Sequence, residues 1–327
     1  MYKYIEIINE LVDKKLIEQA EIFDYNNDSI AEIYDRYFQY CQKALTEYSL
    51  QFDIQPARIF YRNDYSVNAM AGMSGDTYLI KINMGLIDIL YKAFCENNNL
   101  FKENNEDIYA HLAVNFDVPL GYIMFQFATY FTFYHEQGHL IQKSSLLNRF
   151  LNERNIGGDN GYSSFRHSLE FDADLHAAHC LVFIIVEYIK KLPKSNYSTD
   201  VINGILSLAT ASVFINFMYF EEKYHSIYYK ESTHPHPVIR ITYILDVIAS
   251  LAPLNFKDIN IDGNLVLIQC FEIAEMYCQV QEMRDMVKVY ADMYQTEQLN
   301  IEKFINETLI LESDAIPQLI KNRPNYE

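Results

Sequence analysis

The chain contains an H-E-x-x-H string at positions 135–139, directly after the apolar run 118–134. In a helix, residues four apart lie above one another on one face, so His135 and His139 can offer two imidazole nitrogens to one metal ion. Zinc held by imidazoles acidifies a water molecule, and a nearby carboxylate such as Glu136 can accept the proton as the water attacks a carbonyl. The string therefore predicts a hydrolytic zinc site with Glu136 as general base. The alternative is a chance match on a buried helix.

A catalytic zinc ion usually takes three protein ligands, so a third ligand is expected elsewhere in the chain. The metzincin pattern would require glycine and histidine where this chain has Gln142 and Ser145, which excludes that class. A gluzincin instead takes a Glu from a later helix, followed four residues on by an Asp that orients a ligand histidine. Glu170 and Asp174 have this spacing, one helical turn apart. We therefore expect Glu170 to bind the metal and Asp174 to support it.

Other polar residues around Glu170 leave two alternatives open. His167 is a competing third ligand. The carboxylates at 170, 172 and 174 could also form a solvated acidic stripe on the helix surface. His176 and His179 are interpreted as structural, because neither shares the helical face of Glu170 well.

Two helices must hold these residues. The first is expected to start at Asp117 and Pro119, since Asp can cap a helix and Pro is tolerated in its first turn, and to end near 143–148. The second is expected from 164 to 191, where Lys190 and Lys191 suit the negative end of the helix dipole. Between them, the glycine-rich segment 157–161 predicts a loop.

The remaining chain alternates between one strand-like region and several helical ones. Segments 58–72 and 76–84 predict two strands joined by a turn at 73–75. Helical spacing covers 2–20, 29–50, 85–94, 238–251 and most of 265–319, and the Asn-rich segment 96–107 predicts an exposed loop. Asp28 or Ser29 is a plausible cap for the second of these helices.

These elements predict an α+β fold that is mostly helical, with a gluzincin-like core made of a small antiparallel sheet and a helix bundle. We expect an N-terminal helical lead-in at 1–55, a zinc metallopeptidase core at 56–250 and a C-terminal helical extension at 251–327, all packed as one body.

Composition narrows the class of partner. The net charge of −18, from 44 acidic and 26 basic residues, argues against nucleic acid or an anionic membrane surface. Five cysteines without C-x-x-C spacing indicate reduced thiols, with neither a disulfide framework nor a thiolate metal site, and hence a cytoplasmic protein. We expect a polypeptide substrate and no nucleic acid.

Segment 201–220 has no charged residue and is long enough to span a bilayer. It nevertheless contains polar residues such as Asn203 and Asn216, and acidic residues bound it at Asp200 and Glu221. We therefore expect a fully buried central helix, with association with a membrane through 201–220 as the alternative.

Several motifs in the same order resemble the gluzincin metallopeptidases of the CAAX prenyl protease and HtpX type. They are H-E-Q-G-H at 135–139, E-x-x-A-D at 170–174, and T-H-P at 233–235 with Arg240 six residues after the histidine. Upstream, N-A-M-A-G at 68–72 is similar to that family's N-A-F-A strand, and G-L-I at 85–87 to its G-L-L element. The resemblance covers about residues 58–245. A weaker resemblance is to the Lit-type phage-exclusion peptidase.

The resemblance implies a zinc-dependent endopeptidase. It implies that His234 approaches the site to steady the oxyanion or Asp174, and that Arg240 anchors this loop through an ion pair. It also implies that Asn68 and Ala69 lie on an edge strand that binds the substrate backbone. Two other functions stay open: a catalytically quiet zinc-containing module that binds or regulates, and a toxin or defence peptidase that cuts one intracellular protein.

Overall fold

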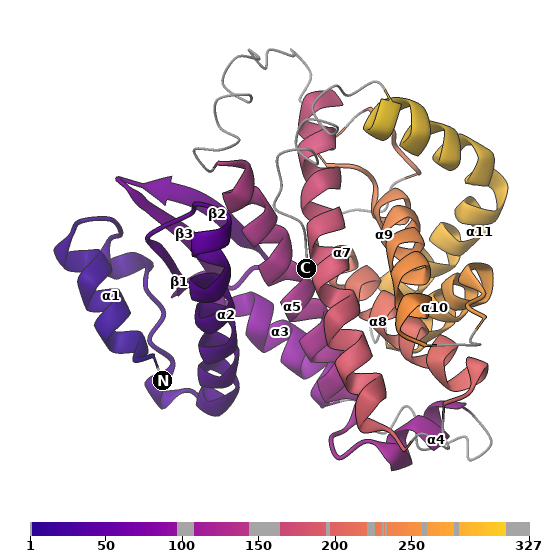
Figure 1. Ribbon diagram of the computed structural model, residues 1–327, viewed down its shortest axis with the longest axis horizontal. Coiled ribbons are helices and arrows are strands. Elements are labelled where there is room, and N and C mark those ends of the chain that lie inside the picture. Colours follow the sequence, from indigo (N-terminus) through magenta and orange to yellow (C-terminus); the bar gives the residue numbers. More distant parts are fainter. Residues whose placement is uncertain are drawn as a thin grey trace.

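Helices make up most of the chain, and a small sheet lies beside the N-terminal helices (Figure 1). The computed structural model describes residues 2–96, 108–143, 164–193, 197–220, 226–230, 232, 234–256, 260–277 and 281–311. The expected α+β class with mostly helical content is confirmed. The loop expected at 157–161, and all but the first residue of the loop expected at 96–107, lie outside the described residues.

The helices follow the apolar periodicity of the sequence, with some differences at their ends. They are α1 (Tyr4–Asp13), α2 (Ala31–Gln51), α3 (Met84–Cys95), α4 (Ile108–Asn115), α5 (Leu120–Gln142), α7 (Ser164–Lys191), α8 (Thr199–Phe220), α9 (Pro237–Leu251), α10 (Gly263–Tyr277) and α11 (Gln281–Phe304). The last of these continues into a π-helical segment, Ile305–Leu311.

The sheet has three strands, β1 (Ala57–Arg62), β2 (Ala69–Ser74) and β3 (Thr77–Asn83), in the order β1-β3-β2. The expected single strand 58–72 is wrong, because the Asp64 side chain accepts hydrogen bonds from Ser66 and turns the chain between β1 and β2. The expected antiparallel sheet is also wrong: β1 pairs with β3 in parallel, and only β2 pairs with it antiparallel.

The β2–β3 hairpin was expected, and its turn lies at Gly75 and Asp76, between the paired residues Ser74 and Thr77. Gly75 has φ of +54°, a left-handed conformation that glycine adopts without steric cost. The central strand β3 is buried along nearly its whole length, and β2 forms one free edge of the sheet. The sheet therefore offers β2 as an edge strand.

The helix with the H-E-x-x-H string runs through the middle of the molecule. Almost every residue of α5 is buried, which explains why its sequence is apolar on all sides. Pro119 is its N-cap residue, so the expected start at Asp117 is two residues early. The helix ends at Gln142 with Lys143 as its C-cap, one residue before the expected range 143–148. The bounds of α7 agree with those expected.

The first helix, Tyr4–Asp13, is shorter at both ends than the expected range 2–20. Helix α1 stops at Asp13, where Lys15 takes a left-handed φ of 56° and the amide of Leu16 donates to the carbonyl of Leu11. This closure usually uses glycine, so the sequence contained no signal for it. Helix α2 begins at Ala31, and Asp28 accepts a hydrogen bond from the amide of Ile30 just ahead of it.

Two helices are long and apolar enough to cross a membrane by length and composition, Thr199–Phe220 and Pro237–Asn255. Helix α8 is enclosed by the rest of the fold, and its apolar window is 100% buried. Segment 201–220 is thus a central core helix here, packed against α5, α9 and α10.

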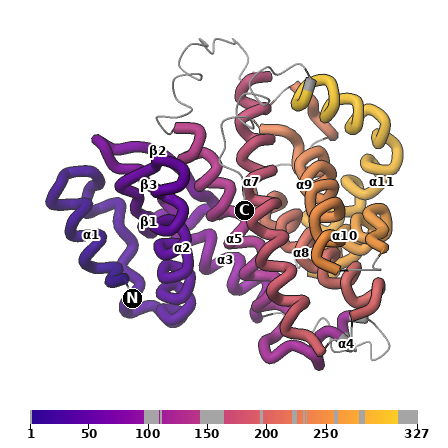
Figure 2. The backbone as a smooth tube through the Cα atoms, viewed as in Figure 1, coloured from indigo at the N-terminus to yellow at the C-terminus, as the bar shows by residue number. Residues whose placement is uncertain are grey.

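Figure 2 shows the path of the chain. The N-terminal helices and the sheet lie at one end of the molecule, and α10 and α11 lie at the other. Helices α5 and α7 pack together between these ends. The expected metal ligands and Glu136 are therefore carried by the two central helices.

Candidate metal centre

Helices α5 and α7 approach one another closely where the H-E-x-x-H string passes Ala173. A Cβ atom on Gly138 would lie 2.9 Å from the Cα and 3.2 Å from the Cβ of Ala173, closer than real contacts allow. The small residues at both positions let the two backbones meet. This crossing brings the His135 and His139 side chains of α5 beside Glu170, one turn before Ala173 on α7.

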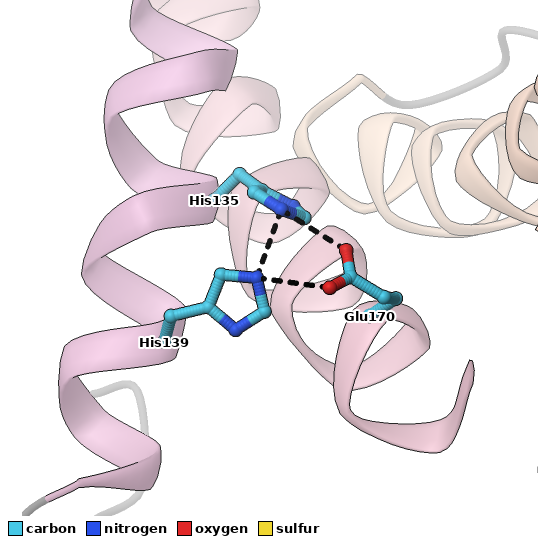
Figure 3. A group of neighbouring side chains, drawn as sticks. All are labelled: His135, His139 and Glu170. Carbon is cyan, nitrogen blue, oxygen red and sulfur yellow. Dashed lines mark hydrogen bonds and ion pairs between the residues drawn. The ribbon is translucent and has the colours of Figure 1, made fainter. Parts of the chain in front are cut away.

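Figure 3 shows the group that results. The Nε2 atoms of His135 and His139 are 3.1 Å apart. The two carboxylate oxygens of Glu170 lie 3.4 Å from the Nε2 of His135 and 3.5 Å from the Nε2 of His139. One ligand atom from each residue lies within 4.8 Å of the other two, which is the spacing of a metal-binding group.

The other ring nitrogen of each histidine has a polar partner, and those partners fix the direction of the rings. His135 donates from Nδ1 to Asp174 at 2.8 Å, and His139 donates from Nδ1 to the amide oxygen of Gln142 at 2.9 Å. Gln142 in turn donates to the carbonyl of Leu169 and to Asp172, both at 2.8 Å, which sets the direction of its amide. When the rings are neutral, this arrangement leaves a lone pair on each Nε2 atom, facing Glu170.

Asp174 is fully buried and accepts four hydrogen bonds. Besides His135, Arg240 donates to both of its oxygens at 2.7 and 2.8 Å, and the Tyr243 hydroxyl donates at 2.6 Å. The Arg240 guanidinium also lies 4.0 Å from the centre of the Phe217 ring. The ion pair of Arg240 thus joins α9 to α7 directly behind the histidine.

The charges of the group shift its pKa values. Burial lowers the pKa of His135, but the carboxylates of Asp174 and Glu170 outweigh burial and raise it to about 10. Burial raises the pKa of Glu170, but His139 and His135 outweigh this and hold it well below its usual range. The oxygen Glu170 Oε2 is buried and has no hydrogen-bond donor in the described part of the chain.

The group opens into a cleft of about 830 Å³. Glu136 lines this cleft, as expected for a residue on the open side of the histidine pair. His234 lines it too, with Nε2 3.5 Å from Glu170 Oε1 and a side chain that is 55% exposed. Thr233 lies outside the described residues.

The edge strand β2 forms one wall of the cleft with Ala69 and Ala71, and Asn68 lines the cleft just before the strand. The amide of Asn83 donates to the carbonyl of Asn68, so in the alternating antiparallel ladder the backbone groups of Ala69 and Ala71 point to the free edge. The amide of Ala69 already donates to the side chain of Asn68 at 2.8 Å. Ala71 is therefore the better-placed residue on this edge, a refinement that the sequence did not offer.

The alternatives to Glu170 receive no support from the geometry. His167 is buried away from the group, with Nε2 2.8 Å from the carbonyl oxygen of Ser232. Asp172 and Asp174 are buried, so the carboxylates of α7 do not form a solvated stripe. His176 and His179 bond to Gln137 and to a backbone carbonyl, consistent with structural roles.

Sequence reasoning missed three residues around the site. Gln142 was used only to exclude the metzincin pattern, although its spacing of three from His139 is within reach on a helix. No local sequence pattern indicated Tyr243. Its hydroxyl on α9 contacts Asp174 on α7, 69 positions away in the chain. Lys143 also lines the cleft, where burial lowers its pKa.

Comparison of the chain with protein-family models, with curated proteins and with solved structures gave no match.

The close crossing of α5 and α7 can be tested with Gly138→Ala. We expect it to cost about 1–3 kcal/mol of stability, as overpacking does, and to weaken zinc binding by displacing Glu170 from the histidine pair. Thermal unfolding with and without zinc measures both effects. Gly263→Ala is the matched control, because a Cβ there meets nothing within 4 Å. If Gly138→Ala behaves like this control, the crossing does not position Glu170.

Proposed function

We propose that this protein is a zinc-dependent metalloendopeptidase in which His135, His139 and Glu170 hold the metal ion. The observation that carries the proposal is the convergence of two imidazole lone pairs and a carboxylate within 4.8 Å, at the wall of a cleft that Glu136 also lines. One metal ion can bind all three ligand atoms at once.

The donor set fits zinc. Two imidazoles and one carboxylate are the ligands of many hydrolytic zinc sites, and three protein ligands leave a place for water. A bound zinc ion would supply Lewis acidity, which lowers the pKa of water towards neutrality. Asp174 holds the ring of His135 and strengthens it as a ligand, and Gln142 does the same for His139.

Glu136 is proposed as the general base. It is next to His135 on the cleft side of α5, so its carboxylate can take a proton from the attacking water and pass it to the departing amine. His234 is proposed to donate a hydrogen bond from the opposite wall to the carbonyl oxygen of the scissile bond as negative charge develops there.

The peptide is proposed to lie along β2. An edge strand holds an extended peptide by main-chain hydrogen bonds and needs no particular side chain for this. The outward groups of Ala71 and the carbonyl of Ala69 are available for such bonds, while the amide of Asn68 adds a side-chain contact at the same wall. This arrangement supports a peptide substrate over a small molecule.

The metal itself is tested by zinc analysis. We expect about one zinc ion per chain in the wild type and almost none in the His135→Ala/His139→Ala double variant. Zinc must displace a proton from His135, whose pKa is raised to about 10, so zinc affinity should fall as the pH is lowered. Equal zinc content in the two proteins would exclude this ligand set.

Glu136→Gln separates chemistry from binding. The amide keeps the shape of the side chain but cannot accept a proton, so turnover of an unfolded protein substrate should fall by at least about a hundredfold while zinc content and thermal stability are retained. This variant also tests the alternative of a quiet zinc-containing module, in which wild type and variant would both be inactive.

The edge strand is tested with two proline variants. Ala71→Pro removes an amide that points to the free edge and should abolish cleavage while zinc content and stability change little. Met70→Pro removes an amide that faces β3, so it should lower stability instead. Full activity of a folded, zinc-loaded Ala71→Pro protein would show that substrates are held elsewhere.

A further inference from the structure

The cleft extends on both sides of the candidate metal centre because α5 runs along it. Thr132, His135, His139 and Lys143 follow one another at steps of three or four residues, so they share one face of the helix, and all four line the cleft. At 1.5 Å per residue, Thr132 and Lys143 are about 16 Å apart along the axis, the length of about five residues of extended peptide. The two ends of this face have different surroundings.

The end near Thr132 is aromatic. Phe131 and Phe217 contribute to its wall, and Phe220, at the last turn of α8, is 38% exposed at the same cleft. The floor is set by Asn216, which donates to the Thr132 hydroxyl at 2.9 Å, while that hydroxyl donates to a helix carbonyl. This end suits a bulky apolar side chain, because burying it removes the Phe220 ring from water as well.

The opposite end is cationic. Lys143 and Arg166 line it, although the chain as a whole carries a net charge of −18. Lys143 is half-buried and forms no ion pair with any residue in the parts of the chain that the structure describes. A partly desolvated ammonium that has no ion-pair partner among the described residues favours an anionic partner. The nearest cleft carboxylates, Glu136 and Glu170, are assigned to the base and the metal.

We propose that the cleft selects peptides with a bulky apolar side chain on one side of the scissile bond and an acidic side chain about two residues away on the other. This inference rests on the proposed peptidase function and names its substrate class. Lys143 lies one helical turn past His139, about 6 Å, which corresponds to about two residues of an extended peptide. Lys143 and Phe220 are thus the residues that determine specificity.

The experiment maps cleavage sites in a proteome-derived peptide library by mass spectrometry. The zinc-loaded wild type should show Asp or Glu enriched about tenfold near the second position on one side, and apolar residues enriched on the other. Lys143→Glu should replace the acidic enrichment with Lys or Arg. Lys43→Glu is the matched control, because it makes the same change of charge at a 69% exposed lysine on α2 and should leave the map unaltered.

Phe220→Ala tests the apolar end separately. Its map should lose the apolar enrichment and keep the acidic one, because Phe220 follows Asn216, which bonds to Thr132, by about one turn of α8. A readout without turnover comes from peptides chosen from the wild-type map and bound to Glu136→Gln. Adding Lys143→Glu to that variant should weaken the binding of acidic peptides about tenfold.

The outcomes separate the two proposals. The specificity inference is overturned if wild type cleaves the library but its map shows no acidic or apolar preference. It is also overturned if Lys143→Glu keeps the wild-type map with unchanged zinc content. In both cases the proposed peptidase function still stands. If no peptide is cleaved by zinc-loaded wild type and none binds to Glu136→Gln, the peptidase proposal fails and the specificity inference fails with it.

Discussion

The buried carboxylate of Asp174 is the interaction on which the arrangement of the site depends. A fully buried charge is tolerated only when its hydrogen-bonding capacity is filled, and Asp174 accepts from His135, Arg240 twice and Tyr243. These donors come from α5 and α9, so one side chain fixes both helices to α7. Arg240 extends the connection to α8 by stacking on Phe217. Loss of any one donor would leave part of a buried charge unpaired.

The carboxylate of Asp174 also fixes the direction in which the ring of His135 faces Glu170. With Asp174 and Gln142 taking the Nδ1 protons, His135 and His139 present lone pairs to the carboxylate of Glu170. Three acceptors facing one another in a buried place are unfavourable until a cation joins them. The pKa of His135 is raised to about 10 because the carboxylates of Asp174 and Glu170 outweigh the effect of its burial.

The surroundings of this centre are uneven in a way that bears on substrate choice. One wall is a free strand edge, which binds backbone and is indifferent to side chains. If a peptide binds there as proposed, selectivity would come from the two ends of the α5 face, one aromatic at Phe220 and one cationic at Lys143. The protein as a whole is strongly acidic, whereas the side chains of Lys143 and Arg166 place positive charge at one end of the cleft.

The sequence by itself determined the residues that could bind a metal and the helices that carry them. His135 and His139 are four residues apart, as are Glu170 and Asp174, and residues with this spacing lie on the same face of a helix. It also indicated a mostly helical fold and the buried 201–220 helix from local apolar pattern alone. Only the tertiary structure decided which partners those residues meet. The parallel pairing of β1 with β3, the Gly138–Ala173 crossing and the reach of Tyr243 to Asp174 join positions far apart in the chain. Local periodicity carries no information about such contacts, since they are selected by the packing of whole helices and strands.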